Sequence, residues 1–430
     1  MSDEWQTYRD DTRTPCKYGR NCYQRNPQHH SSFKHPPKNL KRKNENYRPN
    51  KKRYKLTASP RKDVNDTNKD LDHRDTQGDI GSVDQKTRSN EDNASTSKTD
   101  LDKGSCDDNI VIKFPEILLY HDKSDHNLFK ELFLVEMPED FFKFYKCLEE
   151  LESFEKVLSS VNLELIGPYD LLLGKLPILD NKDLYLVHWR FFYDPPEFQA
   201  ILKKNGKSEY HIGYFRDHPD KPPQFLASCD SSKDCSITPM AKNIFATIYL
   251  YLQNEKNTSP FMSIACQKLM DKVKKWAENH GYPLEKYDMK ERQAKIQTKT
   301  FHGAGIVVPY NKRTQLGYRN LVETDGNLKK MFSKLKSAKT QKEKDDVLSD
   351  LQPVITYANI AVDECDFGTG LEAGINLFCS GIRELEASAL SSLQAAYSLL
   401  KRDEFAKILQ AHLKYRRKGP NLSVLSINEK

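Results

Sequence analysis

The sequence lacks long apolar runs and phosphate-binding glycine motifs. No stretch approaches the roughly 18 apolar residues of a transmembrane helix, and the opening MSDEWQTYRDD has no apolar core like that of a signal peptide. We therefore expect neither a membrane-spanning nor a secreted protein. Neither GxxxxGK nor a GxGxxG that follows a strand pattern occurs, so the two common glycine motifs for nucleotide phosphates are absent from the sequence.

Cysteine is scattered along the chain rather than arranged in a framework. The 430 residues include nine cysteines, an odd number that favours a reducing compartment over disulfide pairing. Cys229 and Cys235 are separated by five residues, but no histidine pair follows them to complete a metal site. We expect these two to be ordinary thiols.

Aromatic residues are missing from residues 63–109, which carry 13 acidic and 6 basic side chains. Such a segment cannot bury enough apolar area to offset the entropy lost on ordering. Residues 34–62 have the opposite charge, with 12 Lys or Arg and one acidic residue. We expect residues 38–109 to be a disordered linker whose basic runs, 41–43 and 51–55, act as a nuclear-import signal; the alternative is a solvated tether.

Two cysteines and two histidines near the N-terminus have the spacing Cys-x5-Cys-x6-His-x5-His. The set is Cys16, Cys22, His29 and His35. Zinc takes four nitrogen or sulfur ligands in a tetrahedron, and a closed set of four is a structural site. About 25 residues cannot form a hydrophobic core, so metal binding would supply most of the folding free energy. His30 is an alternative ligand, and a tail with incidental Cys and His is the alternative interpretation.

The runs CKYGRNCYQRNPQHH at 16–30 and FKHP at 33–36 make residues 12–37 resemble the poly(ADP-ribose)-binding zinc finger, or PBZ. Gln24 stands where that family has Arg, and Pro37 stands where it has Gly. The resemblance implies that aromatic faces stack on adenine and that guanidinium groups pair with phosphate. The residues that would bind poly(ADP-ribose) are Tyr18, Tyr23 and Arg25.

Apolar residues return from Ile110 onward, and we expect the main domain over residues 110–418. Pro138-Glu139-Asp140 ahead of an apolar face predicts the start of a helix. Leu184–Tyr193 predicts a strand that ends before Pro195-Pro196, and 210–216 and 224–228 predict two further strands at hairpin spacing.

Apolar residues at helical spacing follow these strands. They form the sets 244/248/252, 269/273/276, 385/389/393/397/400 and 405/409/413. We therefore predict an α+β fold, in which a helical part and a largely antiparallel sheet are followed by C-terminal helices, after a small zinc finger and the linker.

An acidic segment and a distant arginine form the second candidate site. Asp363, Glu364 and Asp366 precede two glycines, and three crowded carboxylates tend to raise the pKa of one, which makes a better base near neutral pH. Arg319 could hold a carboxylate in a bidentate contact. The alternatives are acids that cap a helix N-terminus with Arg319 at the surface, or a site for an oxygen-liganded cation.

Six stretches in one order resemble the histone PARylation factor family, the accessory proteins of poly(ADP-ribose) polymerases. They are IGPYD at 166–170, HWRFFYDPPEFQ at 188–199, YHIGYFRD at 210–217, GAGIVVP at 303–309, GYR at 317–319 and DECDFGTGLE at 363–372. The resemblance implies a domain that is not an enzyme on its own. It docks on the polymerase catalytic domain, which binds the NAD, and completes a joint active site.

The resemblance also implies residue roles. Glu364 would be the general base for a substrate serine, notably on histones, and positioned proton transfer is worth about 10²–10⁴-fold. Arg319 would orient Glu364 or hold an acidic partner surface. Asp363 would make a docking or histidine contact across the joint interface, and Tyr318 would support the interface. The expected location is the nucleus, on chromatin at DNA damage sites.

Two other functions remain open from the sequence. One is a reader or scaffold that binds poly(ADP-ribose) through the finger and makes no catalytic contribution. The other is a stand-alone ADP-ribosyl enzyme, which the absence of an NAD-cradling motif disfavours.

Overall fold

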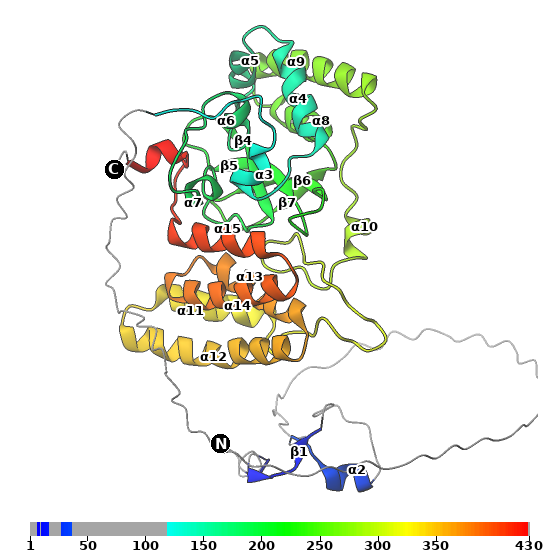
Figure 1. Ribbon diagram of the computed structural model, residues 1–430, viewed down its shortest axis with the longest axis vertical. Coiled ribbons are helices and arrows are strands. Elements are labelled where there is room, and N and C mark those ends of the chain that lie inside the picture. The colour runs from blue at the N-terminus through cyan, green and yellow to red at the C-terminus, as the bar shows by residue number, and fades with distance from the viewer. Residues whose placement is uncertain (1–6, 9, 17–26, 37–117, 429–430) are drawn as a thin grey trace, which may run out of the picture. The chain divides into compact units, whose positions relative to one another are not determined.

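The computed structural model describes residues 7–8, 10–16, 27–36 and 118–428 (Figure 1). The chain divides into two compact units, Met1–Asp100 and Leu101–Lys430. The predicted linker over 38–109, with its basic runs, lies outside the described residues. Within the described ranges, no helix combines the length and apolarity that a membrane crossing requires.

The described residues of the small unit include the short helix α2 and two short strands. Strand β1 (Thr14–Pro15) pairs in parallel with β2 (Phe33–Lys34), and α2 (Pro27–Ser32) precedes β2 directly. The backbone N–H of Cys16 donates to the Lys34 carbonyl at 2.9 Å. This pairing brings the two ends of the finger together.

The large unit is built around an antiparallel five-stranded sheet in the order β3-β4-β5-β6-β7. The strands are β3 (Leu163–Leu165), β4 (Phe198–Lys204), β5 (Tyr210–Phe215), β6 (Phe225–Asp230) and β7 (Thr238–Ala241). The strands predicted over 210–216 and 224–228 are confirmed as β5 and β6, and their antiparallel pairing is confirmed as well.

The strand predicted over Leu184–Tyr193 is wrong. The structure has the short helix α7 (Asp183–Leu186) there, followed by turns, and the next strand begins only at Phe198. The apolar run reflects burial rather than extended backbone. The buried Arg190 side chain donates to the carbonyl of Leu186 within this segment and to the carbonyls of Pro195 and Phe198 beyond it, so these buried acceptors are paired without a neighbouring strand.

One group of helices lies around the sheet, and the C-terminal helices form a separate layer. On the sheet side they are α3 (Leu128–Phe133), α4 (Glu139–Glu149), α5 (Phe154–Ser160), α6 (Tyr169–Leu172), α8 (Ile244–Glu255), α9 (Pro260–Asn279) and α10 (Met289–Gln293). The C-terminal helices are α11 (Asp325–Ser337), α12 (Gln341–Asp363), α13 (Phe367–Ser380), α14 (Glu386–Leu399) and α15 (Asp403–Lys414), with 3-10 turns at Arg383–Leu385 and Val424–Asn428. The helix start at Pro138 and the four helical patterns are confirmed, and the fold is α+β as predicted.

Helix α13 is the centre of the C-terminal layer. Every residue from Gly368 to Ser380 is buried, including the polar residues Thr369, Glu372 and Asn376. It packs between α12 and α14, which lie at the end of the large unit opposite α5 and α9 (Figure 1). Its first turn therefore holds the acidic segment in a fixed position.

Candidate functional site

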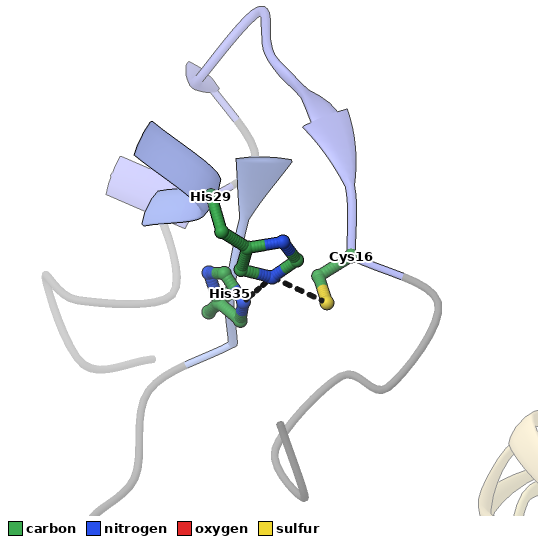
Figure 2. Close-up of side chains that lie close together, drawn as sticks. All are labelled: Cys16, His29 and His35. Carbon is green, nitrogen blue, oxygen red and sulfur yellow. Dashed lines mark hydrogen bonds between the residues drawn. The ribbon is translucent and has the colours of Figure 1, made fainter. Parts of the chain in front are cut away.

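Three of the four predicted zinc ligands converge in the small unit (Figure 2). Nε2 of His29 lies 3.3 Å from Sγ of Cys16 and 3.2 Å from Nε2 of His35. Zinc bound tetrahedrally at about 2.3 Å to sulfur and about 2.05 Å to nitrogen holds its ligand atoms about 3.3–3.6 Å apart. The two separations from His29 are therefore close to those that zinc requires, and all three ligand atoms lie within 4.8 Å of one another.

The structure also decides between the two adjacent histidines. His29 joins the cluster with Cys16 and His35, whereas the His30 ring packs against the His35 ring with centroids 4.5 Å apart. Cys22, the fourth predicted ligand, lies outside the described residues, as do Tyr18, Tyr23 and Arg25. Their roles therefore stay predictions.

The acidic segment forms the turn between α12 and α13. Helix α12 ends at Asp363, and the backbone N–H groups of Cys365 and Asp366 donate back to the carbonyls of Val362 and Ala361. Cys365 has a φ of 68°, a left-handed conformation that reverses the chain direction. As a result, residues 363–365 are exposed and Asp366 is buried.

Glu364 and Arg319 form an ion pair, although 45 residues separate them in the sequence. Arg319 Nη1 donates to Glu364 Oε2, and Arg319 Nε lies 3.5 Å from Asp366 Oδ2. The Glu364 side chain remains 59% exposed. Arg319 contacts Glu364 through one nitrogen and one oxygen rather than in the bidentate contact suggested by the sequence, and its side chain is 30% exposed.

The Arg319 guanidinium contacts an aromatic ring, and the Arg319 backbone forms two hydrogen bonds with one threonine hydroxyl. Its carbon centre lies 5.0 Å from the centre of the Tyr357 ring, which belongs to α12. The Arg319 N–H donates to Thr369 Oγ1 at 2.9 Å, and the same hydroxyl donates to the Arg319 carbonyl at 2.7 Å. Helices α12 and α13 thus fix one arginine together.

Asp366 does not cap α13 with its side chain. Its Oδ1 accepts the Gly317 N–H at 2.8 Å, and the Gly368 N–H donates to the Gly317 carbonyl at 2.9 Å. Gly317 has a φ of 112°, and a Cβ there would lie 2.1 Å from the Pro309 carbonyl oxygen. Asp366 therefore anchors the loop that carries Arg319.

Tyr318 points into a buried hydrogen-bond network. Its hydroxyl lies 3.1 Å from Glu372 Oε2, and Thr298 Oγ1 donates to Glu372 Oε1 at 2.8 Å. Burial raises the pKa of Glu372, and burial together with the Glu372 charge raises the pKa of Tyr318. Tyr318 thus connects the loop that carries Arg319 to Glu372 of α13.

An open groove of about 890 Å³ lies beside the turn. Cys365 and Phe367 line one part of it, and Leu316 and Leu399, each about half exposed, belong to its apolar lining. Glu364 and Asp366 both face the guanidinium of Arg319, so a cation already occupies the place that a metal ion would take. The turn is suited to contact with another molecule rather than to metal binding.

Sequence reasoning missed Tyr357, Thr369 and Glu372 as parts of this site. Tyr357 lies seven residues before Glu364, which is two turns along the same helical face, so helical spacing could have indicated it. Thr369 and Glu372 lie in the segment DECDFGTGLE, but nothing in the sequence shows that they contact residues 50 or more positions earlier.

Comparison with known proteins gives one match in the large unit and one in the small unit. A family model described as Histone PARylation factor 1 matches residues 125–416, and a PBZ domain matches residues 13–38. Histone PARylation factor 1 of Mus musculus is 41% identical over 294 residues, which are 66% of this chain and 84% of that protein. The chain belongs to the histone PARylation factor 1 family.

Other relatives match over the same extent. Histone PARylation factor 1 of Danio rerio is 40% identical over 291 residues, covering 66% of this chain and 83% of its own. A putative histone PARylation factor 1-like protein of Homo sapiens is 37% identical over 300 residues, covering 66% and 85%. The family match contains the turn and the Arg319 loop, and the PBZ match contains Cys16, His29 and His35.

Proposed function

We propose that the large unit docks on the catalytic domain of a poly(ADP-ribose) polymerase and that Glu364 acts there as general base for a substrate serine. The observation that carries this proposal is an exposed carboxylate held in one direction by Arg319. An exposed side chain at a helix end can enter the active site of a neighbouring protein. Family membership supports the polymerase as that protein.

The chemistry explains why a second protein would supply a carboxylate. An Asp or Glu acceptor is already ionised and attacks the NAD ribose carbon directly. A serine hydroxyl must lose its proton as its oxygen bonds to that carbon and the bond to nicotinamide breaks. Glu364 takes the proton, while the polymerase holds the NAD.

The neighbouring residues have supporting roles in this proposal. Arg319 fixes the direction of Glu364, and Tyr318 supports the Arg319 loop through Glu372. Asp363 is exposed next to Glu364 and makes a docking contact with the polymerase. Histone tails are the proposed acceptors.

Glu364→Gln tests the catalytic role. Serine ADP-ribosylation of histone tails by polymerase plus this protein should fall about 10²–10⁴-fold, because the base is lost while the shape is kept. Residue-level mass spectrometry of the modified tails measures this effect, and calorimetry should show polymerase binding within a few-fold of wild type.

Glu149→Gln is the matched control, because Glu149 is also an exposed glutamate at a helix end. It should leave serine modification unchanged. Undiminished serine modification with Glu364→Gln would defeat the general-base role and favour the scaffold function.

We further propose that Cys16, Cys22, His29 and His35 bind zinc and that Tyr18, Tyr23 and Arg25 bind poly(ADP-ribose). The PBZ match and the geometry of the three described ligands support this. Cys16→Ser should abolish zinc binding by the finger, measured by atomic absorption, and weaken poly(ADP-ribose) binding at least tenfold. Cys106→Ser, in the linker sequence, is the control.

The general-base proposal and the zinc-finger proposal can be tested independently of each other. In a purified system, Cys16→Ser should keep serine modification, since the finger takes no part in the chemistry. Normal polymer binding by zinc-free protein would contradict the proposed finger. We also propose a nuclear location on damaged chromatin, with the basic runs at 41–43 and 51–55 as the import signal.

A further inference from the structure

An apolar surface lies at the start of α9, beside α5. Phe261 is 87% exposed and Ile264 is 61% exposed, and they occupy the same helical face because they are three residues apart. Phe261 is the most exposed of the large apolar side chains in the described part of the chain. Large apolar side chains grouped on a surface mark interaction sites in soluble proteins.

A groove of about 480 Å³ continues this surface between the two helices. We name it the α5–α9 groove. Its floor and walls include Val157, Ala265 and Leu269 together with the two exposed residues, and its polar lining includes Lys156 and Lys268. The groove is therefore apolar at its centre and basic at its edge.

The surface belongs to a well-anchored helix and not to a frayed end. Ser259 caps α9, since its Oγ accepts the Met262 N–H at 3.2 Å, and Pro260 occupies the first turn. Further along, Cys266 and Leu269 are buried in the core. The cap fixes where Phe261 projects.

The charges at the groove are unbalanced. Neither Lys156 nor Lys268 forms a salt bridge within the described ranges, whereas Lys272 of the same helix pairs with Glu150. Cations without carboxylate partners beside an apolar centre are complementary to a ligand that has carboxylates next to apolar side chains.

We propose that the α5–α9 groove binds a short peptide segment of a partner protein that carries apolar side chains flanked by Asp or Glu. Figure 1 shows α5 and α9 at the end of the large unit opposite α12 and α13. The groove is therefore separate from the Glu364 turn, and both can be occupied at once. An amphipathic helix laid into a groove is a common form of such binding.

Two other occupants fit less well. In a symmetric contact with a second copy, the same surface would meet itself and bring lysines toward lysines. A nucleic acid would be attracted to the lysines, but it would leave Phe261 and Ile264 without an apolar partner.

Peptide selection tests the proposal. Twelve-residue peptides displayed on phage are selected on the full chain, and clones that also bind the Phe261→Glu variant are removed. The expected consensus has two apolar side chains with adjacent Asp or Glu. Binding of the synthetic consensus peptide is then followed by fluorescence anisotropy at low and high salt.

Three variants sharpen the measurement. Phe261→Ala should weaken peptide binding at least tenfold, and the double variant Lys156→Glu, Lys268→Glu should weaken it at least tenfold and remove its salt dependence. Ile178→Ala, which truncates an exposed apolar side chain outside the groove, should leave binding unchanged.

Several outcomes would overturn the proposal. These are the absence of a consensus above background, a basic or uncharged consensus, and charge reversal without effect on binding. A concentration-dependent dimer in sedimentation velocity that Phe261→Ala abolishes would assign the groove to a second copy instead.

Discussion

A single hydroxyl, that of Thr369, holds the backbone of Arg319. This hydroxyl accepts a hydrogen bond from the Arg319 N–H and donates one to the Arg319 carbonyl. Thr369 itself is fully buried in α13. Arg319 in turn directs Glu364. Thr369 is therefore a positioning residue for the proposed base and does not touch the reacting atoms.

Thr369→Val tests this positioning. It keeps the shape and removes both hydrogen bonds, which leaves two backbone groups unsatisfied at a cost of about 1–3 kcal/mol each in unfolding free energy. Serine ADP-ribosylation should fall about tenfold when the arginine loop shifts, and the mapping assay for Glu364→Gln measures this change.

Rescue separates positioning from general stability. Thr369→Ser keeps the hydroxyl and should restore most of the serine modification. Equal losses in the valine and serine variants would contradict the positioning role of the hydroxyl, because the serine variant retains it.

At this scale the sequence indicated Glu364, Arg319 and Tyr318 but not the other residues that contact them. Glu364 and Arg319 were found from charge, spacing and resemblance. Tyr357 and Thr369 were missed because an aromatic residue on a helix and a threonine near a glycine have ordinary local explanations. Only their contacts with a residue far away in the sequence give them a role.

The α12–α13 turn depends on close approach of three elements. A Cβ on Gly368 would lie 2.8 Å from Val308 Cγ2 and 2.9 Å from the Gly317 carbonyl oxygen. Glycine at this position lets the first turn of α13 press against the loop that leads to Arg319. This contact, together with the hydrogen bond from the Gly317 N–H to Asp366, sets the distance between the α12–α13 turn and the loop that carries Arg319.

Gly368→Ala should disturb that contact. The added methyl group must displace Val308 or the Gly317 loop, so we expect about 1–3 kcal/mol of destabilisation and a loss of serine modification larger than stability alone explains. Thermal unfolding and the serine assay measure the two effects.

Gly326→Ala is the matched control, since its Cβ would meet only Thr324 Oγ1, at 4.0 Å, in the first turn of α11. It should be neutral or slightly stabilising. Equal behaviour of the two alanine variants would contradict the close-approach argument.

Elements were predicted best where their signals were local. The strands β5 and β6 and the helix that follows Pro138 were found because alternation, turn spacing and helix-start residues are local properties. The strand at 184–193 was wrong because this segment forms local turn hydrogen bonds, from the His188 N–H to the Tyr185 carbonyl and from the Arg190 N–H to the Val187 carbonyl, rather than pairing with a neighbouring strand. Ten consecutive residues that are mostly apolar do not show whether the segment forms buried turns or a strand.

The large unit contains a buried charge pair that links its stability to pH. His211 on β5 donates Nε2–H to Asp194 Oδ1 at 2.8 Å and Nδ1–H to the Glu209 carbonyl at 2.7 Å, and Cys229 lies beside it. Burial lowers the pKa of His211, but the Asp194 charge and hydrogen bonds outweigh it and raise that pKa to about 10. The thiol of Cys229 is thus part of a polar cluster and not an isolated core residue.

The pH dependence follows in sign from this shift. A histidine whose pKa is higher in the folded state stabilises the fold fully below the unfolded value of about 6.5 and loses that contribution as pH rises through about 10. The unfolding free energy of the large unit should therefore fall between pH 7 and pH 10, by at most about 1.4 kcal/mol per pH unit. Urea denaturation at a series of pH values measures it.

His211→Gln should flatten this decline, although it lowers stability at pH 7 because Asp194 then remains buried without its cation. His126→Gln, at an exposed histidine, should keep the wild-type slope. A wild-type slope in His211→Gln would assign the pH dependence to other groups.

The sequence by itself determined the features that depend on residue type and spacing. These are the convergence of Cys16, His29 and His35, the hairpin strands, the helix-start signals and the presence of an acidic segment in a family-specific order. The tertiary structure decided that His29 rather than His30 meets Cys16, and that Arg319 faces Glu364 and Asp366. Such choices depend on how α13 packs between its neighbours and on how a chain turn brings distant segments together, and no local pattern encodes either distance.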